Sequence, residues 1–262
     1  MAKTVADVMK LVKENEVKFV DFRFTDTRGK QHHTTVPVSH FDEDKFISGH
    51  AFDGSSIAGW KGIEASDMQL IPDPNSAKMD PVVEETTLIL TCDVIEPSDG
   101  KSYDRDPRSV AKRAEAYLKA SGLGDTAFFG PEPEFFIFDG VRWSTEPNNT
   151  FYEIEEYEAP WNTGAKLEGG NRGHRPTVKG GYFPVPPVDS TQDMRAEMSL
   201  ILESLGIPVE VFHHEVAGAG QNEIGTRFST LVERADWTIL QKYVIHNVAN
   251  AYGKTATFMP KP

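Results

Sequence analysis

Two pairs of glutamates constrain the fold of this chain more than any other feature of its sequence. Glu132 and Glu134 lie in an apolar stretch typical of a β-strand, where residues two apart share a face, so both side chains should point into one cavity. Glu215 and Glu223 flank a glycine-bearing segment centred on Ala219, which predicts that they lie opposite each other across a hairpin. The fold is therefore expected to bring two carboxylate pairs to one site.

Two explanations for these acids remain open. Adjacent buried carboxylates repel each other, so either one takes up a proton or a cation lies between them. Carboxylate ligands without a nearby cysteine favour magnesium or manganese, and ions held in this way usually serve phosphates. Alternatively, the acids are solvated residues at strand edges or partners in salt bridges. His213 and His214, beside the second pair, favour the functional interpretation.

Charge and cysteine content narrow the class of protein. The chain has 262 residues, of which 40 are acidic and 27 basic, and its net charge of -13 repels nucleic acid and anionic membranes. The one cysteine, Cys92, lies in an apolar run, so we expect a structural thiol in a reducing, cytoplasmic setting. No stretch approaches the roughly 18 apolar residues of a membrane helix, and the N-terminus lacks the apolar core of a secretion signal.

Periodicity and turn residues predict an alternation of strands and helices. Strands are expected at residues 17–24, 31–36, 84–95, 130–138, 208–216, 221–228 and 255–259. The first two should form a hairpin that bends at Gly29, and the strand at 84–95 should be buried. Helices are expected after Thr4, from Asp106 to Gly122, from Ser190 to Gly206, and in the stretch that ends at Tyr252. The second helix should have an apolar face made of Val110, Ala111, Ala114, Tyr117 and Leu118.

Two segments are predicted to be loops. Residues 50–75 are dense in glycine, serine and aspartate and carry Trp60, which we expect to be exposed in a candidate site loop. Residues 179–189 contain too many prolines and glycines for a central strand, and residues 140–178 give no assignable pattern. The polar, turn-rich stretch near residue 100 has the composition of a junction, which predicts domains at residues 1–103 and 104–262.

Seven segments of unusual composition, taken together and in order, resemble type I glutamine synthetases from about residue 17 to the end. They are FDGSSIAGW, YDRDPR, GPEPEFF, EGGNRGHRP, KGGYFPVPPVD, HHEVAGAGQNE and GKTATFMPKP. The resemblance implies an α+β fold, with a β-grasp-like N-terminal domain followed by a catalytic domain whose antiparallel strands form half a barrel. It also implies a dodecamer of two stacked rings, with active sites shared between neighbouring subunits.

The implied reaction forms glutamine from glutamate and ammonium with ATP, through a γ-glutamyl phosphate, and uses two divalent ions, Mg²⁺ or Mn²⁺. Glu134, Glu215 and Glu223 match the ligands of one ion, and Glu132 matches a ligand of the second. Two ions fit phosphoryl transfer, since they neutralise the charge of the transferring group and align its donor and acceptor.

The resemblance also assigns substrate positions. Asp53 matches the aspartate that binds ammonium and takes its proton, and Tyr182 helps to build that pocket. Without the resemblance, Asp53 would be a turn residue before glycine, and Tyr182 a loop aromatic packed on prolines. Arg227 could equally be a surface ion-pair partner. The nucleotide-contacting positions are matched by Glu210, Thr226, Arg227 and Phe228.

The sequence departs from the family pattern at its C-terminal end. The family continues past Pro262 with further metal-binding, arginine and flap residues, so the chain as given is expected to be a fragment with negligible activity and an active full-length parent. Two alternatives stay open, a ligase for a larger amine and a non-catalytic ring-forming relative. Asp53 and the intact loop around it favour ammonium, and the retained carboxylates favour catalysis.

Overall fold

The computed structural model describes residues 3–163, 173–260 and 262. The chain divides into two compact units, one of Met1–Phe129 with Ser229–Asp236, the other of Gly130–Phe228 with Trp237–Pro262. The domain boundary expected between residues 103 and 104 stays a prediction. Part of the segment EGGNRGHRP, residues 168–172, lies outside the described residues.

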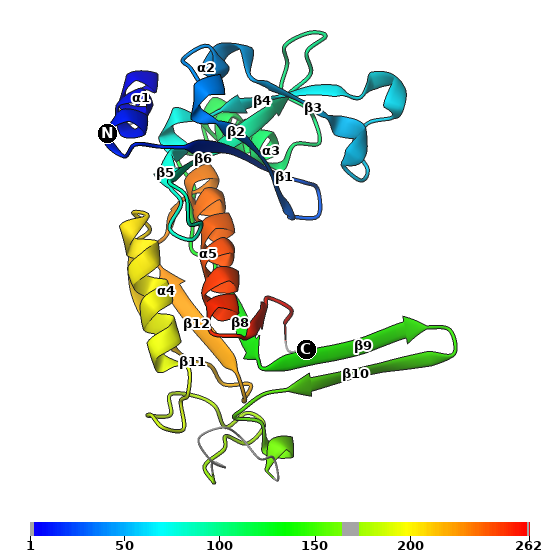
Figure 1. Cartoon of the computed structure of the whole chain (residues 1–262), viewed down its shortest axis with the longest axis vertical. Coiled ribbons are helices and arrows are strands. Elements are labelled where there is room, and N and C mark those ends of the chain that lie inside the picture. Colours follow the sequence, from blue (N-terminus) through cyan, green and yellow to red (C-terminus); the bar gives the residue numbers. More distant parts are fainter. Residues whose placement is uncertain (1–2, 164–172, 261) are drawn as a thin grey trace. The chain divides into compact units, whose positions relative to one another are not determined.

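A mixed six-stranded sheet forms the first unit, in the order β2-β1-β6-β4-β3 with β5 paired to β6 (Figure 1). The neighbours β1 and β6 are parallel, and the other pairs are antiparallel. Its strands are β1 (Phe19–Thr25), β2 (Gln31–Pro37), β3 (His50–Asp53), β4 (Asp67–Pro72), β5 (Lys78–Met79) and β6 (Thr87–Ile95). The predicted hairpin of β1 and β2 and the buried strand β6 are confirmed.

Two helices of the first unit, α1 and α3, begin where the sequence predicts, and the short helix α2 was not predicted. Thr4 caps α1 (Val5–Glu14) in a reciprocal capping box with Asp7. Asp106 caps α3 (Pro107–Ser121), and Gly122 ends it with the left-handed φ of 73° that favours glycine. A single-turn helix, α2 (Lys45–Ser48), precedes β3.

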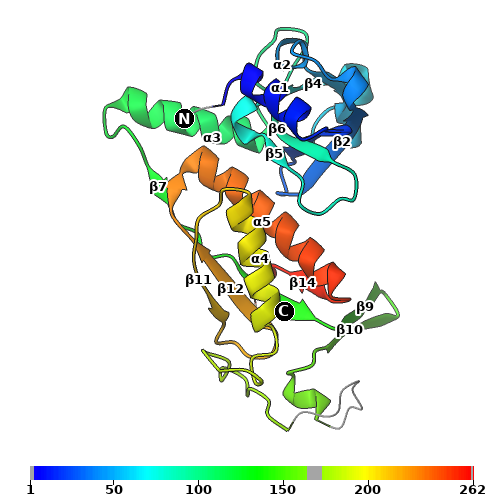
Figure 2. The same ribbon diagram turned by 60° about the vertical axis from the view of Figure 1, so that its left-hand side comes forward.

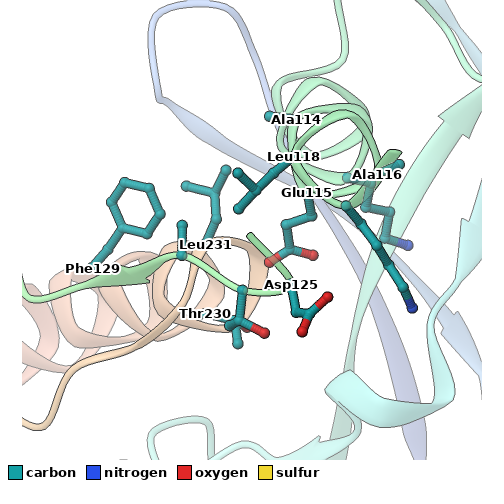
Figure 3. A pocket seen from close by; sticks show the side chains of 12 residues that line it. Ala114, Glu115, Ala116, Leu118, Asp125, Phe129, Thr230 and Leu231 are labelled. Atoms are coloured by element: carbon teal, nitrogen blue, oxygen red, sulfur yellow. The ribbon is translucent and has the colours of Figure 1, made fainter. Parts of the chain in front are cut away.

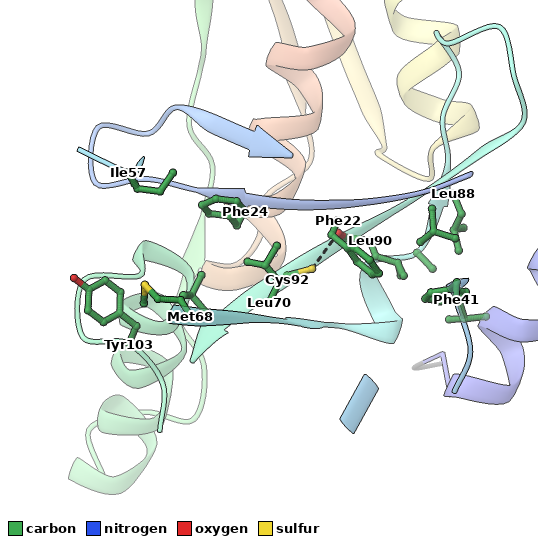
Figure 4. Packing of buried hydrophobic residues seen from close by; sticks show 14 of the residues in the cluster. Phe22, Phe24, Phe41, Ile57, Met68, Leu70, Leu88, Leu90, Cys92 and Tyr103 are labelled. Atoms are coloured by element: carbon green, nitrogen blue, oxygen red, sulfur yellow. Dashed lines mark hydrogen bonds between the residues drawn. The ribbon is translucent and has the colours of Figure 1, made fainter. Parts of the chain in front are cut away.

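Alternate residues of β1 and β6 build the core of this unit (Figure 4). Phe22, Leu88 and Leu90 are fully buried there. The thiol of Cys92 is buried beside them and donates to the carbonyl of Leu90 over 3.5 Å, as a structural thiol should. Its burial raises the pKa of Cys92 well above the usual range, which keeps the sulfur protonated and unreactive.

Two expectations for this unit are wrong. Residues 50–75 are not a long loop, because β3 and β4 pair antiparallel within them and short 3₁₀ turns join the strands. Trp60 is only 5% exposed and packs on Tyr103, with ring centroids 5.2 Å apart. Part of the apolar face of α3 is exposed, since Val110 and Tyr117 are 47% and 76% exposed. Periodicity shows which side of a helix is apolar, but not what packs on it.

A four-stranded antiparallel sheet in the order β11-β12-β8-β14 forms the second unit. Both views show α4 and the later turns of α5 on the same side of this sheet (Figures 1 and 2). Phe135 and Ile224 from the sheet pack there on Met198 and Leu202 of α4 and Val244 of α5. The elements are β8 (Glu134–Phe138), α4 (Gln192–Ser204), β11 (Val209–His214), β12 (Gln221–Thr226), α5 (Leu231–Ala251) and β14 (Thr255–Thr257).

Outside that sheet, the antiparallel pair β9 (Gly140–Glu146) and β10 (Asn149–Glu155) forms a two-stranded ribbon (Figure 1). Most side chains on both of its faces are exposed, so no alternation of apolar and polar residues marked it in the sequence. The short pair β7 (Phe128–Phe129) and β13 (Ser229–Thr230) belongs to the first unit. Within the described residues, no helix is both long enough and apolar enough to cross a bilayer.

Candidate metal centre

The strand register of the second unit places acidic side chains side by side on the face opposite α4 and α5. His213 of β11, Glu223 of β12 and Glu134 of β8 are direct cross-strand partners and form one row. In the next row of the same face, the Glu215 amide donates to the Gln221 carbonyl over 2.9 Å. Side chains two residues apart share a face, so both rows project their polar groups in one direction.

Two details of the sequence-based geometry are wrong. The hairpin is centred on Gly218 rather than Ala219, because Glu223 pairs with His213 and Asn222 with His214, so Glu215 and Glu223 are not direct partners. They still share a face, since Glu215 lies two residues after His213.

The strand β8 begins only at Glu134, and Glu132 precedes it in a tight turn closed by a 2.9 Å bond from the Glu134 amide to the Glu132 carbonyl. Glu132 and Glu134 therefore do not share a strand face as predicted, and both are exposed rather than buried. Glu132 nevertheless lies close enough for its charge to raise the pKa of Glu223.

Three described side chains could share one ion. Single donor atoms of His213, Glu215 and Glu223 all lie within 4.8 Å of one another. The ring nitrogens of His213 lie 3.7 Å from Glu215 Oε1 and 3.6 Å from Glu223 Oε2. Burial raises the pKa of Glu223, the His213 charge opposes that rise, and Glu132, Glu215 and Glu134 add to it. All of the carboxylates that the sequence predicts as ligands thus act on one group.

The donor set fits a divalent cation. Among the described residues, no lysine or arginine is ion-paired to Glu132, Glu134, Glu215 or Glu223. Clustered carboxylates with one imidazole suit Mg²⁺ or Mn²⁺, and the nitrogen donor favours Mn²⁺ of the two. Sequence reasoning left His213 without a role, although its position two residues before Glu215 is the signal that places it on this face.

Gln221 is a further residue that sequence reasoning missed. Its amide nitrogen donates to Glu134 Oε2 over 2.5 Å, and its carbonyl oxygen accepts from the Ala217 amide over 2.7 Å. The side chain is fully buried and thereby orients one carboxylate of the site. Gly220 at the hairpin tip has φ of 70°, and a Cβ there would lie 2.4 Å from the Ile137 carbonyl oxygen, so only glycine allows this close approach.

The four residues matched to nucleotide positions lie together at the other end of the same strands. Glu210 and Arg227 form an exposed ion pair, with Nε and Oε1 3.0 Å apart. Thr226 is buried, and its hydroxyl has no hydrogen-bond partner among the described residues. Phe228 is 59% exposed. Arg227 is thus an ion-pair partner in this structure, and its contact to nucleotide stays a prediction.

Asp53 and Tyr182 lie in different units. Asp53 ends β3 in the first unit, where it is exposed and accepts hydrogen bonds from the Ser55 amide and from the hydroxyls of Ser55 and Ser56 at 2.6–2.9 Å. These bonds lower the pKa of Asp53, which keeps it anionic. Tyr182, in the loop 179–189 of the second unit, stacks on Phe183 at 3.8 Å and meets the His213 ring edge-on at 5.8 Å. That loop contains no strand, as predicted.

A separate open pocket of about 590 Å³ lies in the first unit, between α3 and the pair β7–β13 (Figure 3). Ala114, Leu118, Phe129 and Leu231 give it mainly apolar walls, and Glu115 at its edge already accepts a bond from the Val232 amide over 3.1 Å. Lys112, Lys119 and Asp125 also line it, but the described side chains that are spaced to share one ion lie in the second unit. The sheet face that carries Glu134, Glu215 and Glu223, called the carboxylate face below, is therefore the stronger candidate for chemistry.

Comparison with known proteins assigns a family to this arrangement. Residues 104–262 match the family model described as glutamine synthetase, catalytic domain, and residues 16–97 match the one described as glutamine synthetase, beta-Grasp domain. The chain is 76% identical over 262 residues to a 3-hydroxylaminophenol mutase of Cupriavidus pinatubonensis, and 59% identical over 259 residues to a glutamine synthetase of Vibrio cholerae.

The fold agrees as well. A solved glutamine synthetase of Plasmodium falciparum superposes with a TM-score of 0.90 at 27% identity, covering 100% of this chain and 52% of that one. The chain spans 56% of the length of the mutase and 55% of that of the Vibrio cholerae enzyme, about half of each relative. The expected α+β fold, with a β-grasp domain and the first part of a catalytic domain, is confirmed. The chain belongs to the glutamine synthetase family.

Proposed function

We propose that the protein containing this chain is an ATP-dependent ligase that forms glutamine from glutamate and ammonium through a γ-glutamyl phosphate. The observation that carries the proposal is the cluster of Glu134, Glu215 and Glu223 on one sheet face, with Glu132 beside it and no lysine or arginine paired to any of them among the described residues. Such a cluster in a member of this family supports a centre for cations that bind phosphate.

In this proposal Glu134, Glu215 and Glu223 hold one Mg²⁺ or Mn²⁺, and Glu132 contributes to a second. The ions, when bound, neutralise charge on the phosphoryl group as it passes to the side-chain carboxylate of glutamate. His213 lies between Glu215 and Glu223 and supplies a nitrogen donor or orients both carboxylates. Gln221 holds Glu134 in place through its amide.

Ammonium must lose a proton before it attacks the acyl phosphate. We assign Asp53 to binding the cation and accepting that proton, and Tyr182 to the wall of the ammonium pocket. The lowered pKa of Asp53 supports cation binding, because the carboxylate is ionised at neutral pH. A neighbouring subunit would bring Asp53 to the site, as the family resemblance implies.

Nucleotide binding is assigned to Glu210, Thr226, Arg227 and Phe228. The exposed aromatic ring of Phe228 suits packing on an adenine base, and the unpaired buried hydroxyl of Thr226 suits a polar group of the ligand. We expect the Arg227 and Glu210 ion pair to separate when nucleotide binds, because exposed pairs of this kind contribute at most about 1 kcal/mol.

The family also supports a homo-oligomer, a dodecamer of two rings, that acts in the cytoplasm on small molecules. The net charge of -13 supports the absence of nucleic-acid and membrane partners. Gel filtration of the full-length protein tests the assembly, since a monomeric active enzyme would contradict shared sites.

The reaction is tested by steady-state assays of the full-length protein with ATP, glutamate, ammonium and Mg²⁺ or Mn²⁺. We expect equimolar phosphate and glutamine, no turnover in EDTA, and loss of at least about 100-fold in kcat for Glu223→Gln. Efficient use of methylamine in place of ammonium would instead favour an amine ligase. Metal-dependent nucleotide binding without any turnover would favour a non-catalytic relative.

A second candidate function comes from the relative that is 76% identical over the whole chain, which is named a 3-hydroxylaminophenol mutase. Rearrangement of a hydroxylaminophenol needs an acid to protonate the departing hydroxyl, and Glu223, whose pKa is raised, could supply that proton. Incubation with 3-hydroxylaminophenol in the absence of ATP separates the candidates, because an isomerisation needs no nucleotide and releases no phosphate.

A further inference from the structure

A buried ion pair lies behind the hairpin that carries the carboxylate face. His214 Nε2 is 2.7 Å from Glu158 Oε2, and both side chains are completely shielded from solvent. Glu158 follows β10 and His214 ends β11, so the pair joins segments that are 56 residues apart in the chain. His214 points away from the carboxylate face, because its neighbours His213 and Glu215 point toward it.

Glu158 also accepts hydrogen bonds from three further donors. Its Oε1 accepts from the amide and the hydroxyl of Ser190 at 2.6 Å each, and its Oε2 accepts from the Gly220 amide at 3.3 Å. Burial alone would raise the pKa of Glu158, but the hydrogen bond and charge of His214 lower it to about 2. Glu158 is therefore an acceptor only, and it fixes the hairpin tip to the start of α4.

The other nitrogen of His214 faces two carbonyl groups. Its Nδ1 lies 2.6 Å from the Gly181 carbonyl oxygen and 3.0 Å from that of Glu215. Carbonyl oxygens only accept, and so does ionised Glu158, so both ring nitrogens must carry a hydrogen. The Nδ1–H group of His214 thus donates to two backbone carbonyls. One belongs to Glu215, a predicted metal ligand, and the other to Gly181, the residue just before Tyr182.

The segment around Gly181 fits tightly against this hairpin. A Cβ on Gly181 would lie 2.6 Å from the Glu215 carbonyl oxygen and 2.9 Å from His214 Cε1. The next residues continue the contact, since the Phe183 amide donates to the His214 carbonyl over 3.4 Å and the Phe183 ring meets the His213 ring edge-on at 4.8 Å. Tyr182 is exposed, so its position depends on these backbone contacts rather than on packing of its own ring in a core.

We propose that His214 is a positioning residue whose Nδ1–H group holds residues 181–183, and with them Tyr182, in register with the hairpin that carries Glu215. The functional consequence rests on the proposed function, in which Tyr182 lines the ammonium pocket. Loss of the Nδ1 bond then raises KM for ammonium and leaves kcat and Mn²⁺ binding nearly unchanged. Loss of the Nε2 bond leaves KM for ammonium, kcat and Mn²⁺ binding all nearly unchanged.

Two substitutions separate the two nitrogens. The amide nitrogen of asparagine coincides with Nδ1 of histidine and that of glutamine with Nε2, so His214→Asn keeps the bond to Gly181 and His214→Gln keeps the bond to Glu158. Glu158→Gln leaves the hydrogen on Nδ1. It therefore serves, like His214→Asn, as a variant that keeps the bond to Gly181. His40→Gln, at an exposed histidine of the first unit, is the matched control.

In the full-length protein, amide hydrogen exchange across residues 177–189 is measured together with steady-state kinetics for ammonium and Mn²⁺ titration. For His214→Gln we expect exchange and KM for ammonium to rise about 10-fold, the effect of one lost hydrogen bond to a charged donor. For His214→Asn and Glu158→Gln we expect both quantities within about 3-fold of wild type. His40→Gln should match wild type in every measurement.

Equal acceleration of exchange in His214→Asn and His214→Gln, or none in either, overturns the proposal. If His214→Gln does not fold, Glu158→Gln decides, because a 10-fold rise of exchange at residues 177–189 there contradicts an anchor at Nδ1. If the wild type forms no glutamine, the proposed function fails, and the exchange measurement still decides whether His214 anchors the segment. A kcat that falls with an unchanged KM in His214→Gln contradicts positioning of the ammonium pocket.

Discussion

Two clusters of acidic side chains, one in each unit, differ in what neutralises them. In the first unit Arg108 reaches Asp73 and Asp93 at 2.7 Å each and Asp236 at 2.9 Å, and Lys112 also contacts Asp93. In the second unit the carboxylate face gathers a comparable number of acids, and among the described residues no arginine or lysine is paired to them.

This difference in partners distinguishes an acidic cluster with a structural role from one that has the composition of a cation-binding site. Burial would lower the pKa of Arg108, but its bonds and charge interactions with Asp236 and Asp93 raise it, so the cluster is balanced within the fold. On the carboxylate face, burial is the main cause that raises the pKa of Glu223, the His213 charge opposes the rise, and the neighbouring acids add to it. Among the described residues, no arginine or lysine is paired to these acids. A cation from solution would supply what Arg108 supplies in the first unit.

The largest expected effect is on stability, from removal of the internal cation. Arg108→Met should lower the free energy of unfolding by about 3–5 kcal/mol, because Asp236 loses its cation and Asp73 and Asp93 keep only Lys112 in a partly buried site. Urea denaturation of the full-length protein measures the change. Arg113→Met, at an exposed arginine of the same helix, should change stability by less than about 0.5 kcal/mol, and equal losses in the two variants would contradict a structural role for the Arg108 cluster.

Metal binding should stabilise the fold through the carboxylate face of the second unit, and not through the Arg108 cluster. Mn²⁺ at 100 times its dissociation constant should raise the free energy of unfolding by about 2.7 kcal/mol, and EDTA should reverse the gain. Glu223→Gln should weaken Mn²⁺ binding by at least about 100-fold in a calorimetric titration, because it removes a charged ligand. Asp93→Asn, in the Arg108 cluster, is the control and should bind Mn²⁺ as wild type does, so a parallel loss in both variants would break the comparison.

Glu156 is a buried acidic residue that belongs neither to the Arg108 cluster nor to the carboxylate face. Burial, followed by the charge of Glu158, raises the pKa of Glu156 from its usual 4.5 to about 8. Between these values the folded chain keeps a proton that the unfolded chain has lost, so stability falls as pH rises through this window and levels off above it.

Glu156→Gln imitates the protonated form and should remove that fall. We expect it to match wild type near pH 5 and to exceed it by on the order of 2 kcal/mol at pH 9, measured by urea denaturation at several pH values. The bond that Glu156 Oε2 accepts from the Glu158 amide over 2.6 Å can be kept by the glutamine oxygen. A difference between variant and wild type that does not change with pH would show that Glu156 is ionised throughout.

The smallest expected effect is a change in stability in EDTA, and its sign distinguishes the two acidic clusters. In EDTA, Glu223→Gln should stabilise the chain by about 0.5–1 kcal/mol, because it relieves repulsion among the glutamates. Asp93→Asn should destabilise it under the same conditions, since Asp93 is paired to Arg108. Thermal unfolding of both variants in EDTA gives the two signs, and a loss of stability in Glu223→Gln would mean that its charge is already compensated within the fold.

Local signals in the sequence predicted much of the secondary structure. Thr4 and Asp106 marked helix starts, Gly122 marked a helix end, and the alternation in β1 and the apolar run of β6 marked a hairpin and a buried strand. The ribbon of β9 and β10 was missed because neither of its faces is buried. Trp60 was misplaced because a glycine-rich composition indicates turns, and does not indicate whether the strands around those turns cover a side chain.

The candidate site was predicted in content but not in geometry. Glycines near Glu215 and Glu223 indicated a hairpin, and its centre was misplaced by one residue because several glycines could form the turn. The partnership of Glu223 with Glu134 could not be found, because their strands are far apart in the sequence: Gln221 and Glu134, which share a hydrogen bond, are separated by 87 positions. The pairing of His214 with Glu158 gave no signal in the sequence, since neither lies in a periodic pattern with the other.

The sequence by itself determined many of the helices and strands, and which carboxylates could serve a metal, because caps, turns and alternation act over a few residues. Only the tertiary structure decided that Asp73, Asp93 and Asp236 meet an arginine, while Glu134, Glu215 and Glu223 share a face with a histidine and have no paired arginine or lysine among the described residues. Charge compensation depends on distances of a few ångströms between residues far apart in the chain, and strand register and helix packing set those distances.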